Sequence, residues 1–263
     1  MTKAESPLVL RTDEGPVRTL TLDRGERFNP LSSTMIAALQ AELDAIAADE
    51  AIRVVVLAAR GRGFCAGHDL KEMRAHASDA AWQRQLFDDC SRMMMTLTRI
   101  PQPVIARVHG IAAAAGCQLV AMCDLAVASE AASFALPGIN VGLFCSTPAV
   151  AVARNIGWKR VMELLLTGKP IDARTAQTWG LINEVVPAEA LDAGVRRFAD
   201  LIVAHSAATV ALGKRTFYSQ IGGSLEAAYD IASESMACNM GYEDAAAGID
   251  AFLSKRPAER KAR

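Results

Sequence analysis

The sequence predicts an α/β domain that is followed by a helical C-terminal portion. Two segments, RVVVLAA (53–59) and VIARVHG (104–110), are apolar and rich in β-branched residues, as in strands that are buried on both faces of a sheet. Each is followed by a turn of small residues and then by a segment with helical patterning. From about Ala188 onward the pattern is helical. No Pro/Ser-rich linker divides the chain, so we expect one α/β unit with an appended helical region.

The other elements also alternate between strand and helix patterns along the chain. The segment VRTLTLD (17–23) alternates in polarity as a strand does, whereas 32–49 carries apolar residues at helical spacing behind a serine that can cap it. Asp172 is likewise a residue that can cap a helix. The expected strands are 17–23, 53–59, 104–110, 125–129 and 182–187, and the expected helices are 32–49, 78–99, 114–124, one from residue 146 and one from residue 172.

Charge and hydropathy exclude several classes of protein. The 263 residues carry 28 basic and 29 acidic side chains, a formal net charge of −1, so the chain has no overall field that attracts nucleic acid or an anionic membrane. Gly, Pro or charged residues interrupt every apolar run well before it reaches membrane-spanning length. We therefore expect no nucleic-acid partner and no membrane partner, and any ligand must be held by a local site.

The cysteines and the first residues indicate the compartment. Six cysteines are scattered through apolar segments, which in a chain of this length indicates reduced core or pocket residues. The opening segment MTKAESPLVLRTDEGPV has neither the apolar run of a secretory signal nor the Arg-rich pattern of a transit peptide. We expect a cytoplasmic protein.

The two turns that follow the buried strands have a physical use. Turns of small residues leave backbone N–H groups free and let a ligand approach the main chain closely. Two such turns that face each other can supply two N–H donors to one oxygen atom. This arrangement stabilises an enolate or a tetrahedral oxyanion.

Four segments carry a resemblance to a known family: VVVLAARGRGFCAGHDLKEM, PQPVIARVHGIAAAAGCQLVAMCDLAVAS, SFALPGINVGL and LLLTGKPIDARTAQTWGLINEVVP. In this order and at this spacing, they resemble the enoyl-CoA hydratase/isomerase (crotonase) superfamily. The resemblance implies a spiral of ββα units in residues 1–195, and a helical trimerisation region in 196–263. It further implies a homotrimer or a dimer of trimers. The ligand it implies is an acyl-CoA thioester, with coenzyme A as part of the substrate and no tightly bound cofactor.

The resemblance also assigns roles to individual residues. It implies that the backbone N–H groups of His68 and Ala115 are the oxyanion donors. Ala115 stands where the family commonly has glycine, which requires a negative φ because a Cβ atom penalises the left-handed region. The residues expected to contact the acyl-CoA are Arg62, Ala66, His68, Asp69, Leu70, Lys71 and Ala115, with Arg62 near the phosphates.

Both acids of the usual hydratase are missing from this sequence. Hydration of an enoyl thioester needs one group that takes a proton from water and one that delivers a proton to Cα, and two glutamates normally share these tasks. By motif they correspond to Gln118 in GCQL and to Gly138 in LPGI. Neither residue can titrate, so the two-carboxylate mechanism is not open to this chain.

Other residues are candidates to replace the two missing acids. Cys145 could act as a nucleophile or base only if its pKa were depressed, and otherwise it is an inert pocket thiol. A dyad of His68 with Asp69 is disfavoured because adjacent side chains rarely aim at one point, and Asp69 suits a helix cap. No His or Cys has zinc-ligand spacing, so we expect no metal. The glycine spacing in GRGFCAG (61–67) is one residue longer than in the dinucleotide-binding fingerprint, which disfavours a dinucleotide site.

Two interpretations of function stay open. The first is an enzyme that acts on acyl-CoA as an isomerase, thioester hydrolase, decarboxylase or weak hydratase, using the two N–H groups and an unconventional proton relay. The second is a catalytically inactive acyl-CoA-binding protein. The paired turns favour the first interpretation, and the loss of both acids favours the second.

Overall fold

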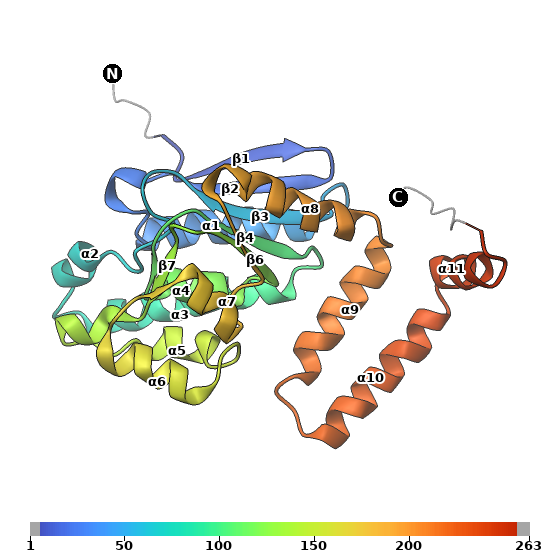
Figure 1. Ribbon diagram of the computed structural model, residues 1–263. Coiled ribbons are helices and arrows are strands. Elements are labelled where there is room, and N and C mark those ends of the chain that lie inside the picture. The colour runs from blue at the N-terminus through green and yellow to red at the C-terminus, as the bar shows by residue number, and fades with distance from the viewer. Residues whose placement is uncertain (1–5, 257–263) are drawn as a thin grey trace.

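A six-stranded sheet runs through the centre of the computed structural model, which describes residues 6–256 (Figure 1). Its strand order is β1–β2–β3–β4–β6–β9; β1 and β2 are antiparallel and the other neighbours are parallel. The bounds are β1 Val9–Glu14, β2 Val17–Leu22, β3 Val54–Ala59, β4 Val104–Val108, β6 Leu125–Ser129 and β9 Glu184–Val186. A smaller sheet contains β5 (Ala112–Ala113), β7 (Ser133–Ala135) and β8 (Ile171–Asp172).

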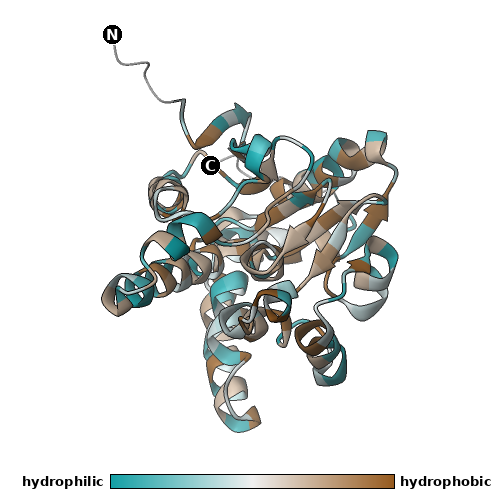
Figure 2. Cartoon of the chain, turned by 90° about the vertical axis from the view of Figure 1, so that its left-hand side faces the viewer, coloured by the Kyte–Doolittle hydropathy of each residue, from teal (hydrophilic) through white to brown (hydrophobic). Residues whose placement is uncertain are grey.

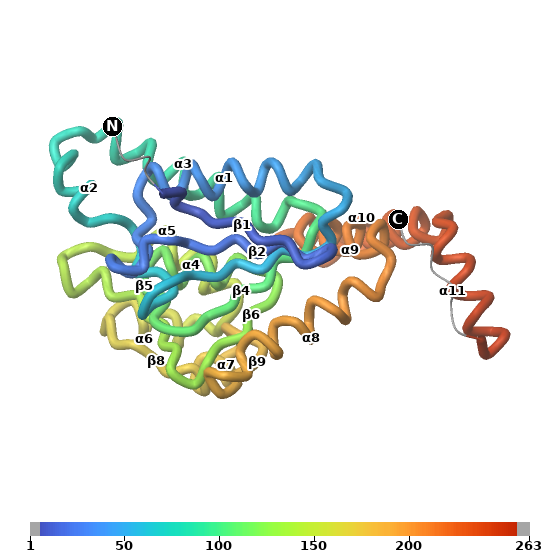
Figure 3. The backbone as a smooth tube through the Cα atoms, turned by 90° about the horizontal axis from the view of Figure 1, so that it is seen from above, coloured from blue at the N-terminus to red at the C-terminus, as the bar shows by residue number. Residues whose placement is uncertain are grey.

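Helices cover both faces of the large sheet. Seen from above, α1 lies on one side of the strands and α8 on the other (Figure 3). The helix bounds are α1 Ser33–Ala47, α2 Leu70–Ala75, α3 Ala80–Arg99, α4 Ala115–Met122, α5 Ser146–Val152, α6 Trp158–Thr167, α7 Ala173–Trp179, α8 Leu191–Val203, α9 Ala207–Gln220, α10 Leu225–Met240 and α11 Glu243–Leu253. Short 3-10 helices lie at η1 Gly25–Arg27, η2 Pro137–Val141 and η3 Ala188–Ala190.

The burial of strand β3 on both faces explains why its sequence is apolar throughout. All six of its residues are buried. Val55 and Leu57 face the main core, whereas Val54 and Val56 pack in a separate cluster with residues of α8. Successive side chains of a strand point to opposite faces, so both faces are covered here, as predicted. Hydrophobic residues are accordingly concentrated on the central strands in Figure 2.

The predicted strands and helices are confirmed to within a few residues of their ends. Asp172 caps α7 by accepting a hydrogen bond from Thr175 N at 2.7 Å. β1 was not predicted because four of its six residues are exposed, so it shows no buried face in the sequence. The short strands β5, β7 and β8 were also missed, since elements of two or three residues have no periodicity to detect.

The C-terminal helices project from the body of the molecule. α9 and α10 form an antiparallel pair that extends away from the sheet, with α11 beyond it (Figure 1). α8 still packs on the sheet through Leu191 and Val195, so the boundary expected at 195/196 falls inside a helix and the projecting part begins at α9. Residues 257–263 of the expected C-terminal region lie outside the described residues.

A buried lysine fastens this projecting part to the core. Lys214 of α9 is 8% exposed. Its Nζ atom donates to Leu97 O at 2.7 Å, to Gln102 O at 2.8 Å and to Asp124 Oδ2 at 2.7 Å. The same Asp124 oxygen accepts Val104 N at 2.7 Å, at the start of β4. One carboxylate therefore joins α9 to the central sheet.

Candidate functional site

The two strand–turn–helix units predicted from sequence lie side by side. β3 and β4 are parallel neighbours, so the turns that follow them meet at one edge of the sheet. The turns are hydrogen-bonded to each other: Phe64 N donates to Ile111 O at 2.9 Å, and Ala113 N donates to Cys65 O at 2.9 Å. His109 adds a contact from its Nε2 to Gly61 O at 2.9 Å. These bonds make the two turns one rigid structure.

Gly67 is the point at which the two turns come closest. Its φ is +96°, a conformation that side-chain-bearing residues rarely adopt. A Cβ atom on Gly67 would lie 2.9 Å from Ala114 Cβ and 3.2 Å from Ala115 N. Glycine is therefore required for both the conformation and the space. It brings the peptide that carries the His68 N–H next to the start of α4.

The described part of the chain uses neither the His68 N–H nor the Ala115 N–H. Among residues 6–256 neither N–H donates a hydrogen bond to the protein. Ala115 is the first residue of α4, where the helix has no acceptor for the N–H. Leu31 N bonds to Gly67 O at 2.8 Å, which ties down the chain just before His68 without using the His68 N–H. The structure thus brings the two predicted donors into one place.

The sequence argument concerned the φ angle of Ala115, but the residue with a positive φ in the second turn is Ala114, one position earlier. Ala115 is helical, as the sequence argument requires, but Ala114 has φ 49° and ψ −119°. This conformation is costly for a residue with a Cβ atom, by about 1–3 kcal/mol. The Ala114 N–H donates to Ala135 O at 2.9 Å, which helps to hold the turn. Strain of this kind is concentrated at binding and catalytic sites.

Gln118 lies one helical turn after Ala115 and is 5% exposed. Its Oε1 atom is buried and has no hydrogen-bond partner among residues 6–256. Buried polar atoms are nearly always paired, and Gln118 Oε1 is one of five buried side-chain polar atoms of the described residues that have no partner. It occupies the position that the resemblance gives to the first missing acid.

Gly138 and Cys145 lie against each other at the position of the second missing acid. Gly138 is in η2, and Cys145 immediately precedes α5. A Cβ atom on Gly138 would lie 2.8 Å from Cys145 Sγ. Cys145 is 8% exposed, and burial raises its pKa although the Gly138 backbone opposes this. Its sulfur is therefore a neutral thiol, which is the opposite of what a nucleophile or base needs.

The His68 side chain is largely buried and neutral. Burial lowers the pKa of His68 to about 4, although the charge of Glu72 acts in the opposite direction. The ring packs near Phe87 with 5.3 Å between centroids, and its Nε2 is buried without a partner among residues 6–256. Asp69 is committed elsewhere: its Oδ1 accepts Lys71 N at 2.9 Å as the cap of α2. The structure therefore does not form a His68–Asp69 dyad.

Several of the residues expected to contact the acyl-CoA are exposed at the surface. Arg62 is exposed, and its guanidinium lies over the Phe28 ring at 5.2 Å from the centroid. Ala66 and Lys71 are also exposed, and Leu70 is 53% exposed although it is apolar. An exposed positive charge and an exposed apolar side chain are free to meet a ligand that lies across them.

Asn29 is a residue that the sequence analysis missed. It is completely buried and has a φ of 51°. Its Nδ2 donates to Arg60 O at 2.9 Å, Gly63 O at 3.1 Å and Phe64 O at 3.1 Å, while its Oδ1 accepts Arg24 N at 2.8 Å. Asparagine suits this role because it tolerates positive φ. The Asn-Pro pair at 29–30 is a turn signal that could have drawn attention to it.

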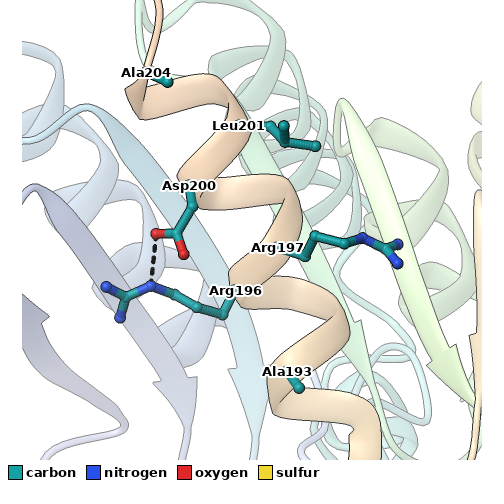
Figure 4. A pocket seen from close by; sticks show the side chains of 6 residues that line it. All are labelled: Ala193, Arg196, Arg197, Asp200, Leu201 and Ala204. Atoms are coloured by element: carbon teal, nitrogen blue, oxygen red, sulfur yellow. Dashed lines mark hydrogen bonds and ion pairs between the residues drawn. The ribbon is translucent and has the colours of Figure 1, made fainter.

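Two surface depressions of the described residues lie away from these turns. One of about 490 Å³ runs along the outer face of α8 and is lined by residues of this helix and by Ala204, which directly follows it (Figure 4): Ala193, Arg196, Arg197, Asp200, Leu201 and Ala204. Arg196 and Asp200 there pair at 2.7 Å. A depression formed by one helix lacks the convergent groups of a binding site.

Residues 6–256 contain neither a metal-binding cluster nor a membrane-spanning helix. No group of three or more His, Cys, Asp or Glu side chains that could hold a metal ion occurs in this part of the chain. None of its helices is long and apolar enough to cross a membrane.

The fold and the paired turns are those of a crotonase-type α/β protein. The chain belongs to the enoyl-CoA hydratase/isomerase family, whose model matches residues 12–263. It is 44% identical over 254 residues to the mouse enoyl-CoA hydratase domain-containing protein 3, mitochondrial, covering 97% of this chain and 84% of that protein. The family predicted from the motifs is confirmed.

Solved structures agree with this assignment. An enoyl-CoA hydratase from Mycobacterium smegmatis superposes with a TM-score of 0.95 at 53% identity, covering 97% of this chain and 99% of that one. Human enoyl-CoA hydratase domain-containing protein 3 superposes with a TM-score of 0.92 at 41% identity, covering 96% and 100%. The predicted crotonase-type fold with C-terminal helices is therefore confirmed.

The expected cytoplasmic location is contradicted by the comparison. The mouse, rat, frog and human relatives are all named as mitochondrial proteins. The expectation rested on the composition of the first 17 residues, and this segment does not determine the compartment of a protein with such relatives.

Proposed function

We propose that the protein binds acyl-CoA thioesters with the thioester carbonyl oxygen on the N–H groups of His68 and Ala115. The observation that carries this proposal is the contact of the two turns at Gly67, with both N–H groups unpartnered among residues 6–256. Two preorganised donors stabilise negative charge on the oxygen, as in an enolate. The family name of the chain supports coenzyme A as the carrier of the acyl group.

The chain's own residues limit the reaction that follows binding. Gln118 can hold a water molecule or a substrate group by hydrogen bonds but cannot exchange a proton near neutral pH. Gly138 has no side chain, and the neighbouring Cys145 thiol has a raised pKa. Because a positioned acid or base contributes about 10²–10⁴-fold, we propose that ordinary hydratase turnover is weak or absent.

Titration of crotonyl-CoA into the protein in a calorimeter tests both parts of this proposal. A saturable heat pulse that returns to baseline is the expected result and means binding without turnover. A steady heat rate proportional to protein concentration means an active enzyme and contradicts the limit on turnover. Absence of any heat above dilution contradicts the binding site itself. Arg62→Ala should weaken binding of coenzyme A and of crotonyl-CoA alike, since we propose that its charge contacts the phosphates.

A second candidate function is that of a non-catalytic acyl-CoA-binding protein. The observation that favours it is the neutral state of three side chains of the proposed site, namely the Gln118 amide, the His68 imidazole and the Cys145 thiol. Such a protein would hold the thioester without converting it. Prolonged incubation with crotonyl-CoA, followed by mass analysis of the thioester, separates this candidate from slow isomerase or hydrolase activity.

We also propose that the chain assembles through its projecting helices as a homotrimer or a dimer of trimers. Large apolar side chains are exposed on these helices: Phe217, Ile221, Leu225, Tyr229, Met236, Met240, Phe252 and Leu253. Exposed apolar surfaces of this extent mark contact sites between proteins. Sedimentation analysis should give a trimer or hexamer mass, and Tyr229→Asp should lower it; a monomer mass for the unmodified chain contradicts the proposal.

A further inference from the structure

A cleft on the α8 side of the large sheet is lined by groups from several elements. Helix α8 packs on β3, β4, β6 and β9, and the β1–β2 hairpin extends the sheet beyond it (Figure 1). The cleft has a volume of about 400 Å³, and residues of β1, β2, β3, β4 and α8 line it. Its walls therefore converge from different parts of the chain, as those of ligand sites do.

The floor of the cleft has a small apolar residue between two longer side chains. Thr21 of β2 lies beside Ala58 of β3 in the register of these strands. Strands β3 and β4 pair up to Leu57 and Ala106. The residues that follow this pair, Ala58 and Arg107, therefore also lie side by side. Because all three side chains line the cleft, the space above Ala58 is open to an apolar group of a ligand.

Arg107 and Asp192 form an ion pair in the cleft that leaves part of each side chain unused. Arg107 Nε lies 2.5 Å from Asp192 Oδ1. In the described part of the chain neither side chain has another hydrogen bond, so the Nη groups of Arg107 and the Oδ2 atom of Asp192 are open. The hydrogen bond from Arg107 lowers the pKa of Asp192, which is therefore charged at neutral pH. An open pair of donors and an open anionic acceptor consequently lie side by side.

The charges that line the cleft are balanced. Arg196 donates through Nε to Asp200 at 2.7 Å and through Nη1 to Glu14 at 3.1 Å. The cleft is therefore lined by two cations and two anions, namely Arg107, Arg196, Glu14 and Asp192. A ligand with a net charge would leave one of these groups without compensation. A ligand with one positive and one negative group matches the lining.

We propose that this cleft binds a free α-amino acid with a large apolar side chain. The ligand carboxylate accepts hydrogen bonds from the Nη groups of Arg107, since a guanidinium matches a carboxylate through two parallel bonds. The ligand ammonium group donates to Asp192. Both ligand groups are attached to one carbon atom, so they lie side by side as their two receptors do. The apolar side chain lies over Ala58. This site is separate from the paired turns and does not depend on the proposed acyl-CoA function.

Calorimetric titration of the full chain with three matched compounds tests the proposal. L-Phenylalanine has both charged groups, 3-phenylpropionate lacks the ammonium group, and phenethylamine lacks the carboxylate. Phenylalanine should bind saturably, and each analogue should bind about tenfold or more weakly. An analogue that binds as tightly as phenylalanine overturns the inference. Leucine, methionine and valine are titrated in the same way, and absence of saturable binding for all four amino acids also overturns it.

Single substitutions locate the bound amino acid. Arg107→Met removes the donors to the carboxylate and should weaken phenylalanine binding about tenfold or more. Asp192→Asn keeps the shape but removes the charge, so the preference for phenylalanine over 3-phenylpropionate should fall to within about twofold. Arg174→Met breaks an exposed ion pair with Glu130 outside the cleft and is the matched control, which should keep both affinities.

Two results would place the amino acid elsewhere and overturn the inference. One is a phenylalanine affinity that survives Arg107→Met. The other is competition between phenylalanine and crotonyl-CoA, because the cleft and the paired turns are separate sites. Saturation with crotonyl-CoA should leave the affinity for phenylalanine unchanged.

Discussion

The sulfur of Cys145 lies 2.8 Å from the point that a Cβ atom on Gly138 would occupy. The thiol therefore fills the space through which the side chain of a second acid would have to pass. Leu143 O is 3.0 Å from the same point and closes it further. A side chain at position 138 and the thiol of Cys145 would therefore compete for the same space.

Restoring the acids of a hydratase should thus require three substitutions. Gln118→Glu with Gly138→Glu supplies both carboxylates, but the second of them collides with Cys145 Sγ. We expect the double variant to be destabilised by about 1–3 kcal/mol through overpacking. Adding Cys145→Ala should recover part of this stability and raise crotonyl-CoA hydration above that of the double variant, in a spectrophotometric assay. Equal stability of the double and triple variants would contradict the steric argument.

His68 should make the folded state less stable in mild acid. Its pKa is about 4 in the folded protein against an ordinary value of 6.5, so the unfolded chain binds more protons between these values. Stability is therefore complete above about pH 6.5 and falls as the pH drops toward 4, by about 3 kcal/mol from this residue. His68→Asn should flatten this part of the curve in urea denaturation at a series of pH values. Parallel curves for the two proteins would exclude His68 as the cause.

Asn29 should stabilise the conformation of the Gly-rich turn at 61–67 without contacting the ligand. Asn29→Ala leaves three backbone carbonyls and the Arg24 N–H without their buried partner, so we expect a loss of about 3 kcal/mol or more. Asn29→Asp should be at least as harmful, because a carboxylate would then face three carbonyl oxygens. Coenzyme A affinity should fall in both variants under conditions where they remain folded. Gln40→Ala, which removes a partly exposed amide, is the control.

Lys214 should contribute several kcal/mol to the free energy of unfolding by holding α9 against the core. Lys214→Met leaves the Asp124 carboxylate buried without its cation, which typically costs about 3–5 kcal/mol. The double variant Lys214→Met/Asp124→Asn should be more stable than the single one, since the uncompensated charge is gone while an oxygen remains for Val104 N. Arg84→Met breaks an exposed pair and should cost less than about 1 kcal/mol in the same denaturation series. A single variant as stable as the double one would contradict this view.

The sequence alone predicted the parts of the fold that have strong periodicity or close family motifs. The burial of strand 53–59 on both faces was predictable because a run of β-branched residues is typical of such a strand. The turn at Gly67 was predictable because glycine is typical of tight turns. The contact of Cys145 with Gly138 could not be predicted, since it joins residues whose spacing depends on the path of η2. The same holds for Asn29, whose three carbonyl partners lie 31 to 35 residues further along the chain. Long-range contacts of single polar side chains leave no local pattern.

The carbonyl stretch of a bound thioester tests the central claim most directly. Butyryl-CoA labelled with ¹³C at the carbonyl is bound to the protein, and its infrared band is compared with that of the free thioester. Hydrogen bonds from His68 and Ala115 N–H should polarise the carbonyl and move the band to lower wavenumber, by the same amount in Arg62→Ala once that variant is saturated. A band at the free position in a saturated complex would contradict the account, because the thioester would then be bound without its oxygen on the paired turns.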